Sequence, residues 1–410
     1  MDNVHTGRDP LFFGGETAVE YWRRASRRGV RPKPVAGITL KSAPDLKHLA
    51  ESSYNVRAMA NLRGMLHVYV SNTGCVPKGK FGVPFNVKLP DPRFAPHGSG
   101  AALCGDLDSY RCETVTAKMV AHRLSTDSSV GAYCFVAPGV YVASPTLSLL
   151  QCAGSLPLPS LMQLAYEFCG MFSVDVLNPK GYIERLPLTD SSSVSAAIDQ
   201  FVKSGPVRGS GALKIVSDRL IDGIRCPSAA ALCSLFCAPA GSGGYALPTP
   251  RAGVLHRLAS EEIDDGIPCR ILIDLLWTKW PDRPDMDWSC GQSIGVIVCD
   301  GGMRSSKRII ELHESVPNSR NIALVCLSAS DLQSRATCNS VAKMIRGVVG
   351  GKRPKPVGDY DLRNESMRSD LFESVSIASK RIDTTKGPVN HGALTRKYAW
   401  KIQVMVKRWC

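Results

Sequence analysis

The stretch RILIDLLW, residues 270 to 277, precedes SIGVIVCDGG, residues 293 to 302, and together they decide the fold of the second half of the chain. Both stretches are dominated by apolar side chains, and this pattern predicts two buried strands. Asp274 lies inside the first strand with apolar residues on both sides. A buried carboxylate without a partner costs several kcal/mol or becomes protonated. The partner of Asp274 is therefore the first question that the sequence raises, and a metal ion is one answer.

The elements around these two strands predict an α/β sandwich. Two helices precede them, in GSGALKIVSDRLIDG (209–223) and CPSAAALCSLFCAP (226–239), and the Gly/Pro turn GGYALPTP follows the second helix. After the strands we expect a helix at 303–315, a strand at 321–329 and a helix at 331–349. Helices and strands in this order are typical of a sheet covered by helices.

The first half of the chain predicts an α+β region. Alternating apolar residues indicate strands at 65–72, 82–90 and 133–145, and helices are expected at 146–154, at 158–172 and from Ser193. We therefore divide the chain into an α+β domain at 1–145, a helical connection at 146–208, an α/β sandwich at 209–350 and a loose basic tail at 351–410.

The positive charge of the chain is concentrated at its two ends. The formal net charge is +14, and residues 1–100 hold 15 Lys/Arg against 7 Asp/Glu. Residues 343–410 hold 15 against 6, whereas residues 101–342 hold 20 against 23. This distribution suggests an anionic partner, of which nucleic acid is the commonest, and the alternative is charge that only keeps exposed tails soluble.

Two basic clusters are the candidate nucleic-acid contacts. One lies at the end of a predicted helix in GGETAVEYWRRASRR and contains Arg23, Arg24, Arg27 and Arg28. The other lies in GKRPKP and contains Lys352, Arg353 and Lys355. Contacts from such residues to phosphates are salt-sensitive and sequence-tolerant. The aromatic residues of TAVEYW fit a buried helix face better than a platform on which bases stack.

The 15 cysteines indicate reduced thiols rather than a disulfide framework. They are scattered, several lie in apolar segments such as ALCSLFC (231–237), and no CxxC pair supports a zinc ribbon. No apolar run has the length of a membrane-spanning helix, and the first thirty residues are charged rather than signal-like. We expect a cytoplasmic protein without a membrane partner.

Other catalytic signatures are weak. The histidines do not pair with any cysteine at ligand spacing, and no GxSxG elbow supports Ser-His-Asp hydrolysis. The GSGG at 241–244 has no Lys-Ser/Thr after it, so it predicts a turn rather than a phosphate-binding loop.

Several motifs resemble those of one protein family. The run VYVASPTLSLLQCAGSLPLPSLMQLAYEFCG and the opening LFFGGETAVEYWR resemble actinobacterial proteins related to the abortive-infection antitoxin (AbiEi-like) family. The stretches CPSAAALCSLFCAP, GGYALPTP, DLLWTKWPD and VIVCDGG resemble the domain that follows in many members. That domain is a nuclease fold related to the very-short-patch-repair endonuclease, in the PD-(D/E)xK group. The resemblance covers most of residues 10–350.

The resemblance implies a magnesium site that this chain has largely lost. Such a nuclease binds Mg²⁺ through acidic residues on two neighbouring strands, and the metal activates water. Asp274 matches the first acidic residue, but the second falls on Val298 and the helix glutamate on Ala229. Asp300, two residues beyond Val298, lies on the same strand face and offers a replacement, with Lys307 as the basic helper. The alternative for Asp274 is a hydrogen bond to backbone, or a pair with Arg270 or Lys279.

We therefore expect a nucleic-acid-binding or regulatory protein, with DNA as the expected nucleic acid, whose endonuclease-like domain is degenerate. An antitoxin or phage-defence context with a cognate toxin as partner is what the resemblance implies, although no winged helix is visible at the start. No cofactor is expected in that case. Two alternatives stay open: a working Mg²⁺-dependent endonuclease built on Asp274 and Asp300, and a protein-interaction module that binds no nucleic acid.

Overall fold

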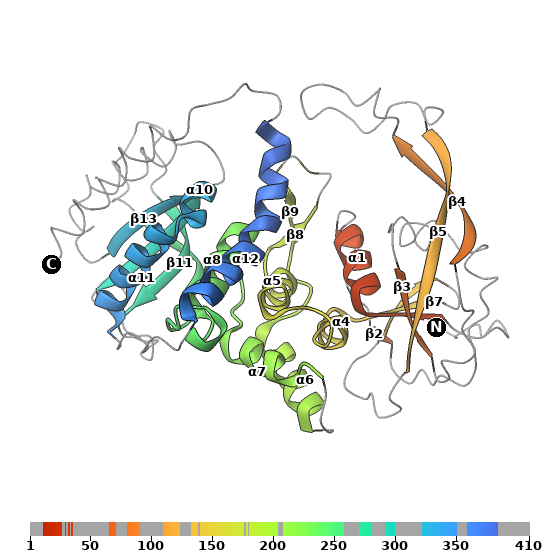
Figure 1. Cartoon of the computed structure of the whole chain (residues 1–410), viewed down its shortest axis with the longest axis horizontal. Coiled ribbons are helices and arrows are strands. Elements are labelled where there is room, and N and C mark those ends of the chain that lie inside the picture. Colours follow the sequence, from red (N-terminus) through yellow and green to blue (C-terminus); the bar gives the residue numbers. More distant parts are fainter. Residues whose placement is uncertain are drawn as a thin grey trace. The chain divides into compact units, whose positions relative to one another are not determined.

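The chain is an α/β protein, as the sequence predicts, with helices and both parallel and antiparallel strands (Figure 1). In the computed structural model, the described residues are 11–26, 29, 32, 34–35, 65–70, 80–90, 110–123, 133–137, 140–175, 178, 180–203, 208–257, 270–279, 292–299, 322–350 and 359–383. The chain divides into two compact units, one of Met1–Gly154 with Ala196–Val207 and one of Ser155–Ser195 with Arg208–Cys410.

A seven-stranded mixed sheet forms the first unit. Its strands in spatial order are β2 (Pro34–Val35), β6 (Tyr133–Ala137), β7 (Val140–Ala143), β1 (Leu11–Phe13), β3 (Met65–Val70), β5 (Tyr110–Arg123) and β4 (Lys80–Pro90). The short strand β1 is central, because it pairs in parallel with β7 and antiparallel with β3. The predicted strands are present as β3, β4, β6 and β7, whereas β1, β2 and β5 were not predicted.

Two helices, α1 (Gly15–Ser26) and α4 (Pro145–Cys152), pack together in this unit. The buried indole of Trp22 donates from Nε1 to the carbonyl oxygen of Ala143 over 2.8 Å. Ser144 caps α4, because its Oγ accepts from the backbone N–H of Leu147, and Pro145 follows in the first turn. The helix α1 is thereby fixed to the chain segment that connects β7 to α4.

The second unit begins with helices that the apolar periodicity predicts. They are α5 (Leu158–Cys169), α7 (Ser210–Arg219) and α8 (Pro227–Cys237). The short 3-10 helix η3 (Ala240–Ser242), which was not predicted, follows α8, and a hairpin of β8 (Phe172–Val174) and β9 (Tyr182–Glu184) follows α5. The division between the units falls within α6 (Ser191–Lys203). Nearly every residue of α8 is buried, because α5, β11 and α12 all contact it.

A four-stranded sheet follows in the order β10 (Arg251–Arg257), β11 (Arg270–Thr278), β12 (Ser293–Cys299) and β13 (Ile322–Ser328). The pairs are antiparallel except β12 with β13, which is parallel. The three predicted strands are confirmed as β11, β12 and β13. The edge strand β10 was not predicted, because Gly253, with φ +62°, interrupts a short strand of mixed polarity.

The helix predicted at 331–349 is split in two. The first part is α10 (Ala329–Gln333) and the second is α11 (Arg335–Val349), which contacts β11 and β12. Ser334 separates the two helices with extended backbone, and its Oγ accepts from the N–H of Thr337 and so caps α11. The buried positions Cys338, Val341, Ala342 and Ile345 form one face of α11. The helix predicted at 303–315 lies outside the described residues.

The expectation of a loose tail is wrong for residues 360–383, which form the helix α12 (Tyr360–Asp383). This helix contacts α5, α8, α10 and η3 (Figure 1). Its anchoring side chains are the buried residues Asn364, Met367, Arg368, Leu371 and Phe372. Two of these five are polar, and this hides the helical period from an analysis based on apolar residues alone.

Two further findings concern the described residues. Among them, no helix is both long enough and apolar enough to cross a bilayer. Eight cysteines whose side chains are described are free thiols, and all but Cys326 are buried. Burial raises the pKa of the Cys152 thiol to about 12 and that of the Cys338 thiol to about 12.

We expect thiol alkylation of the native protein to follow this burial. At pH 8, iodoacetamide should label Cys326 several-fold faster than Cys152 and Cys338, because a buried thiol with a high pKa is neither exposed nor ionised. Quenched time courses with peptide mass mapping measure each rate. Equal labelling of the three cysteines in the folded protein contradicts the described core.

Gly295 tests the packing of the four-stranded sheet. A Cβ added there would lie 2.8 Å from Cδ2 of Leu324 and 2.9 Å from Cγ2 of Ile273. We expect Gly295→Ala to lower the free energy of unfolding by about 1–3 kcal/mol, because the core has no room for it. Urea denaturation followed by circular dichroism measures the change.

The matched control is Gly347→Ala on α11, where the added Cβ has no neighbour within 4 Å in the described part of the chain. This change should stabilise the protein by about 0.5–1 kcal/mol, because alanine is the better helix former. If both variants unfold at the urea concentration of the original protein, the register of β11, β12 and β13 is wrong.

Candidate functional site

Asp274 lies where two strands of the second unit stop pairing. The register of β11 with β12 runs from Thr278↔Ser293 to Leu275↔Val296, and Asp274 is the next residue of β11. Its Oδ2 accepts a hydrogen bond of 2.7 Å from the backbone N–H of Val298. The side chain of Asp274 therefore accepts a hydrogen bond from β12 at the point where the backbone of β11 no longer pairs with that strand.

This hydrogen bond is one answer to the question of the partner of Asp274. Of the alternatives raised by the sequence, a bond to backbone is present, and the donor belongs to the strand position where the second acidic residue was expected. Burying the Val298 N–H without an acceptor would cost about 1–3 kcal/mol. The carboxylate of Asp274 thus has a structural task that requires no metal ion.

The two positions at which the sequence resemblance predicts carboxylates are apolar and buried. Val298 is 8% exposed, and Ala229 lies fully buried in the first turn of α8. Neither side chain has an oxygen for a hard cation such as Mg²⁺. Asp300 and Lys307 lie outside the described residues, so the structure does not test their role. Among described residues, no group of three His, Cys, Asp or Glu side chains has an arrangement that fits a metal ion.

The aromatic residues of the candidate basic helix are part of the core. Trp22 is 1% exposed, and Tyr21 packs against it edge to face with ring centroids 5.0 Å apart. Neither ring is available to stack on a base. The choice of a buried helix face over a stacking platform is therefore confirmed for TAVEYW.

Two of the seven predicted basic contacts are described. Arg23 and Arg24 lie in the last turn of α1, and both are partly exposed. The guanidinium of Arg24 is 2.8 Å from the carboxylate of Glu20, one turn earlier, so part of its charge is compensated locally. Arg27, Arg28, Lys352, Arg353 and Lys355 lie outside the described residues.

The sequence did not reveal that residues 239–245, here called the glycine loop, hold the helix α12. Three side chains of α12 donate to carbonyl oxygens of this loop. These bonds are Arg363 Nη1 to Gly241 over 2.8 Å, Asn364 Nδ2 to Gly243 over 2.7 Å and the Tyr360 hydroxyl to Gly244 over 3.2 Å. The GSGG motif is a turn, as predicted, and its carbonyl oxygens bind the side chains of α12.

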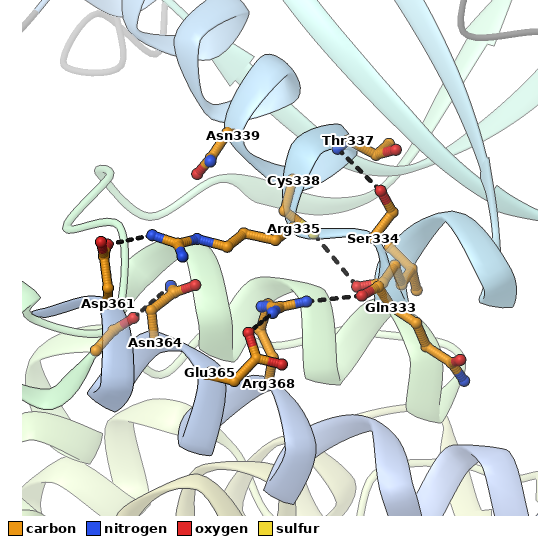
Figure 2. A network of polar contacts seen from close by, with 12 residues as sticks. Gln333, Ser334, Arg335, Thr337, Cys338, Asn339, Asp361, Asn364, Glu365 and Arg368 are labelled. Carbon is orange, nitrogen blue, oxygen red and sulfur yellow. Dashed lines mark hydrogen bonds and ion pairs between the residues drawn. The ribbon is translucent and has the colours of Figure 1, made fainter. Parts of the chain in front are cut away.

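A second set of polar contacts joins α12 to the turn between α10 and α11 (Figure 2). Arg368 is 6% exposed and donates from Nη1 to the carbonyl oxygen of Gln333 over 2.6 Å. Its guanidinium also pairs with Glu365, and Arg335 at the start of α11 pairs with Asp361. Figure 2 shows these residues side by side, with Asn364 close to Asp361.

Tyr245 lies at the centre of this region as a neutral hydrogen-bond donor. Burial raises its pKa above the ordinary value, the nearby Cys338 and Tyr360 raise it further, and Arg368 and Arg335 oppose the rise. Its hydroxyl donates to Asn339 Oδ1 over 2.7 Å, and its carbonyl oxygen accepts from Arg346. Tyr245 therefore acts here as a neutral hydrogen-bond donor that links the glycine loop to α11.

Comparison with known proteins identifies no relative: no protein-family model, curated protein or solved structure matches the chain.

The carboxylate of Asp274 should be replaceable by an amide. We expect Asp274→Asn to keep most of the stability, because its Oδ1 can accept from Val298 N–H. Asp274→Ala should lower the free energy of unfolding by about 1–3 kcal/mol, because the buried N–H loses its acceptor. Equal losses in the two variants, measured by urea denaturation, contradict a hydrogen-bonding role.

Proposed function

We propose that this chain is a nucleic-acid-binding or regulatory protein of the antitoxin or phage-defence type, with a nuclease-like domain that does not cleave efficiently. In this proposal, the nuclease-like domain is assigned to the four-stranded sheet with α8 and α11. DNA is the proposed nucleic acid, a cognate toxin the proposed protein partner and the cytoplasm the proposed location. The motifs of the sequence support this context.

The single observation that carries the proposal is the hydrogen bond from Val298 N–H to Asp274. A carboxylate that binds a catalytic Mg²⁺ must direct its oxygens at the metal together with other oxygen ligands. Asp274 instead gives one oxygen to backbone, and the apolar side chains of Val298 and Ala229 occupy the positions of its expected companions. Of these three matched positions, only Asp274 has side-chain oxygens that can bind a metal ion. The proposed function therefore includes no metal-dependent step.

Charge supports nucleic acid as the ligand. The chain carries +14 at pH 7, and the surplus is confined to its two ends. In the described part of the first unit, Arg23 and Arg24 are partly exposed at the end of α1. Positive charge of this kind recognises the phosphate backbone through release of counterions and reads no sequence.

Cleavage separates the proposal from the rival endonuclease. Supercoiled plasmid should remain intact after incubation with the purified protein and Mg²⁺ or Mn²⁺, within the sensitivity of a gel assay. Asp274→Ala serves as the control for any trace of nicking. Nicking that needs Mg²⁺ and disappears in Asp274→Ala and in Asp300→Ala would establish the endonuclease and refute the proposal.

The salt dependence of DNA binding distinguishes a nucleic-acid-binding protein from a protein-interaction module. We expect the affinity for a mixed-sequence DNA duplex to fall at least tenfold between 50 and 200 mM NaCl, since the logarithm of the binding constant falls by roughly 0.9 per phosphate contact for each tenfold rise in salt. Fluorescence anisotropy measures the affinity. Arg23→Gln and Arg24→Gln should each reduce the slope, because each variant removes one positive charge from the end of α1. Binding that does not depend on salt would contradict the electrostatic argument.

A further inference from the structure

The helix α12 packs against α5, α8, α10 and the glycine loop (Figure 1). We call the surface that these four segments present to α12 the groove. The buried side chains of α12 belong to Asn364, Met367, Arg368, Leu371 and Phe372, and this spacing of three and four residues is the one with which an amphipathic helix enters a groove. We propose that this groove is a preformed site whose occupant, residues 359–383 of this chain, can leave and be replaced by the same helix supplied from outside.

The groove does not need α12 for its own shape. The glycine loop is fixed to the end of α8 by backbone hydrogen bonds from Tyr245 to Leu235 over 3.0 Å, from Ala246 to Ala238 over 2.9 Å and from Leu247 to Phe236 over 2.8 Å. Within the loop, Ser242 and Gly244 both donate to Pro239. The carbonyl oxygens that α12 uses are therefore held in place by bonds in which α12 has no part.

The groove contacts both the apolar side chains and the backbone of α12. Met367, Leu371 and Phe372 are buried, and Gln163 of α5 donates from Nε2 to the carbonyl oxygen of Leu371 over 2.9 Å. At Gly243 the two backbones approach so closely that an added Cβ would lie 2.4 Å from the carbonyl oxygen of Arg363. The groove therefore selects a particular helix by both side chains and shape.

Some polar groups of α12 weaken its binding to the groove. Asn364 and Arg368 are buried, yet Oδ1 of Asn364 and Nε of Arg368 have no hydrogen-bond partner among the residues that the structure describes. Unsatisfied buried polar atoms cost free energy that is recovered when the helix returns to water. The ion pairs Arg335 with Asp361 and Arg368 with Glu365 have partly exposed partners, so they add little. Docking is thus specific without being strong.

The test uses full-length protein and a fluorescent peptide of residues 359–383. The original protein should bind the peptide weakly, because its own α12 competes at a high effective concentration. The double variant Asn364→Ala/Leu371→Ala weakens only the resident helix and should bind the peptide at least tenfold more tightly, measured by anisotropy. A peptide carrying Asn364→Ala should bind roughly three- to tenfold more weakly. A peptide carrying Leu362→Ala should bind unchanged, because Leu362 is 72% exposed.

The groove itself is tested by two glycine variants in the background of the double variant. Gly243→Ala should abolish peptide binding, because the new Cβ occupies the place of the Arg363 carbonyl. Gly241→Ala should leave binding intact, because no atom of the described residues lies within 4 Å of its added Cβ. Equal binding by the two glycine variants overturns the proposal, and so does a folded double variant that binds the peptide no better than the original protein.

Hydrogen exchange of the original protein gives a readout that needs no variant. Amides of residues 361–372 should exchange together and faster than those of residues 229–237 in α8, because α12 leaves the groove without global unfolding. Identical protection of the two helices overturns the proposal. Dimers that dissociate on addition of the peptide would overturn the assignment to a helix of the same chain, because the occupant would then come from a second copy.

Discussion

The second unit is organised by the need to cover α8 on every side. This helix has almost no polar side chain, and nearly all its residues are buried, so each of its faces is covered by another element in the folded chain. The sheet covers one side, where Trp277 lies beside Phe236 with ring centroids 6.1 Å apart and donates from Nε1 to Pro248. α5 and α12 supply the other contacts, and Tyr166 of α5 reaches Cys233. The positions of the sheet, of α5 and of α12 all follow from this one requirement.

Polar side chains in this fold often replace backbone partners. Asp274 accepts from the Val298 amide where β11 and β12 diverge, and Glu167 accepts from the Val174 amide at the start of the β8–β9 hairpin. Gln163 and Asn364 each donate to a carbonyl oxygen of a neighbouring segment. Each of these contacts lies where one regular element ends or two elements meet, and there a buried peptide group would otherwise be unpaired. A buried carboxylate in such a chain therefore has a structural explanation before a catalytic one.

The sequence predicted those elements in which apolar residues form a long run or a regular period. The strands β11, β12 and β13 and the helices α5 and α8 were predicted because long apolar runs or clear periods mark them. β10 and α12 were missed, since Gly253 breaks one pattern and the buried Asn364 and Arg368 break the other. Within the candidate site, Asp274 was correctly singled out as a residue that needs a partner. That partner is the backbone amide of Val298. Every residue except proline has such an amide, so the identity of residue 298 could not predict the hydrogen bond.

The order of elements along the chain has a consequence for synthesis on the ribosome. α8 emerges about 120 residues before α12, and the part of its surface that α12 covers has no other described partner until residues 360–372 have left the exit tunnel. At ordinary elongation speeds of about 5–20 residues per second, this interval lasts several seconds or longer. During that time an apolar surface stays open to water and to other nascent chains. The glycine loop, which follows α8 directly, is already in place to receive the helix when it arrives.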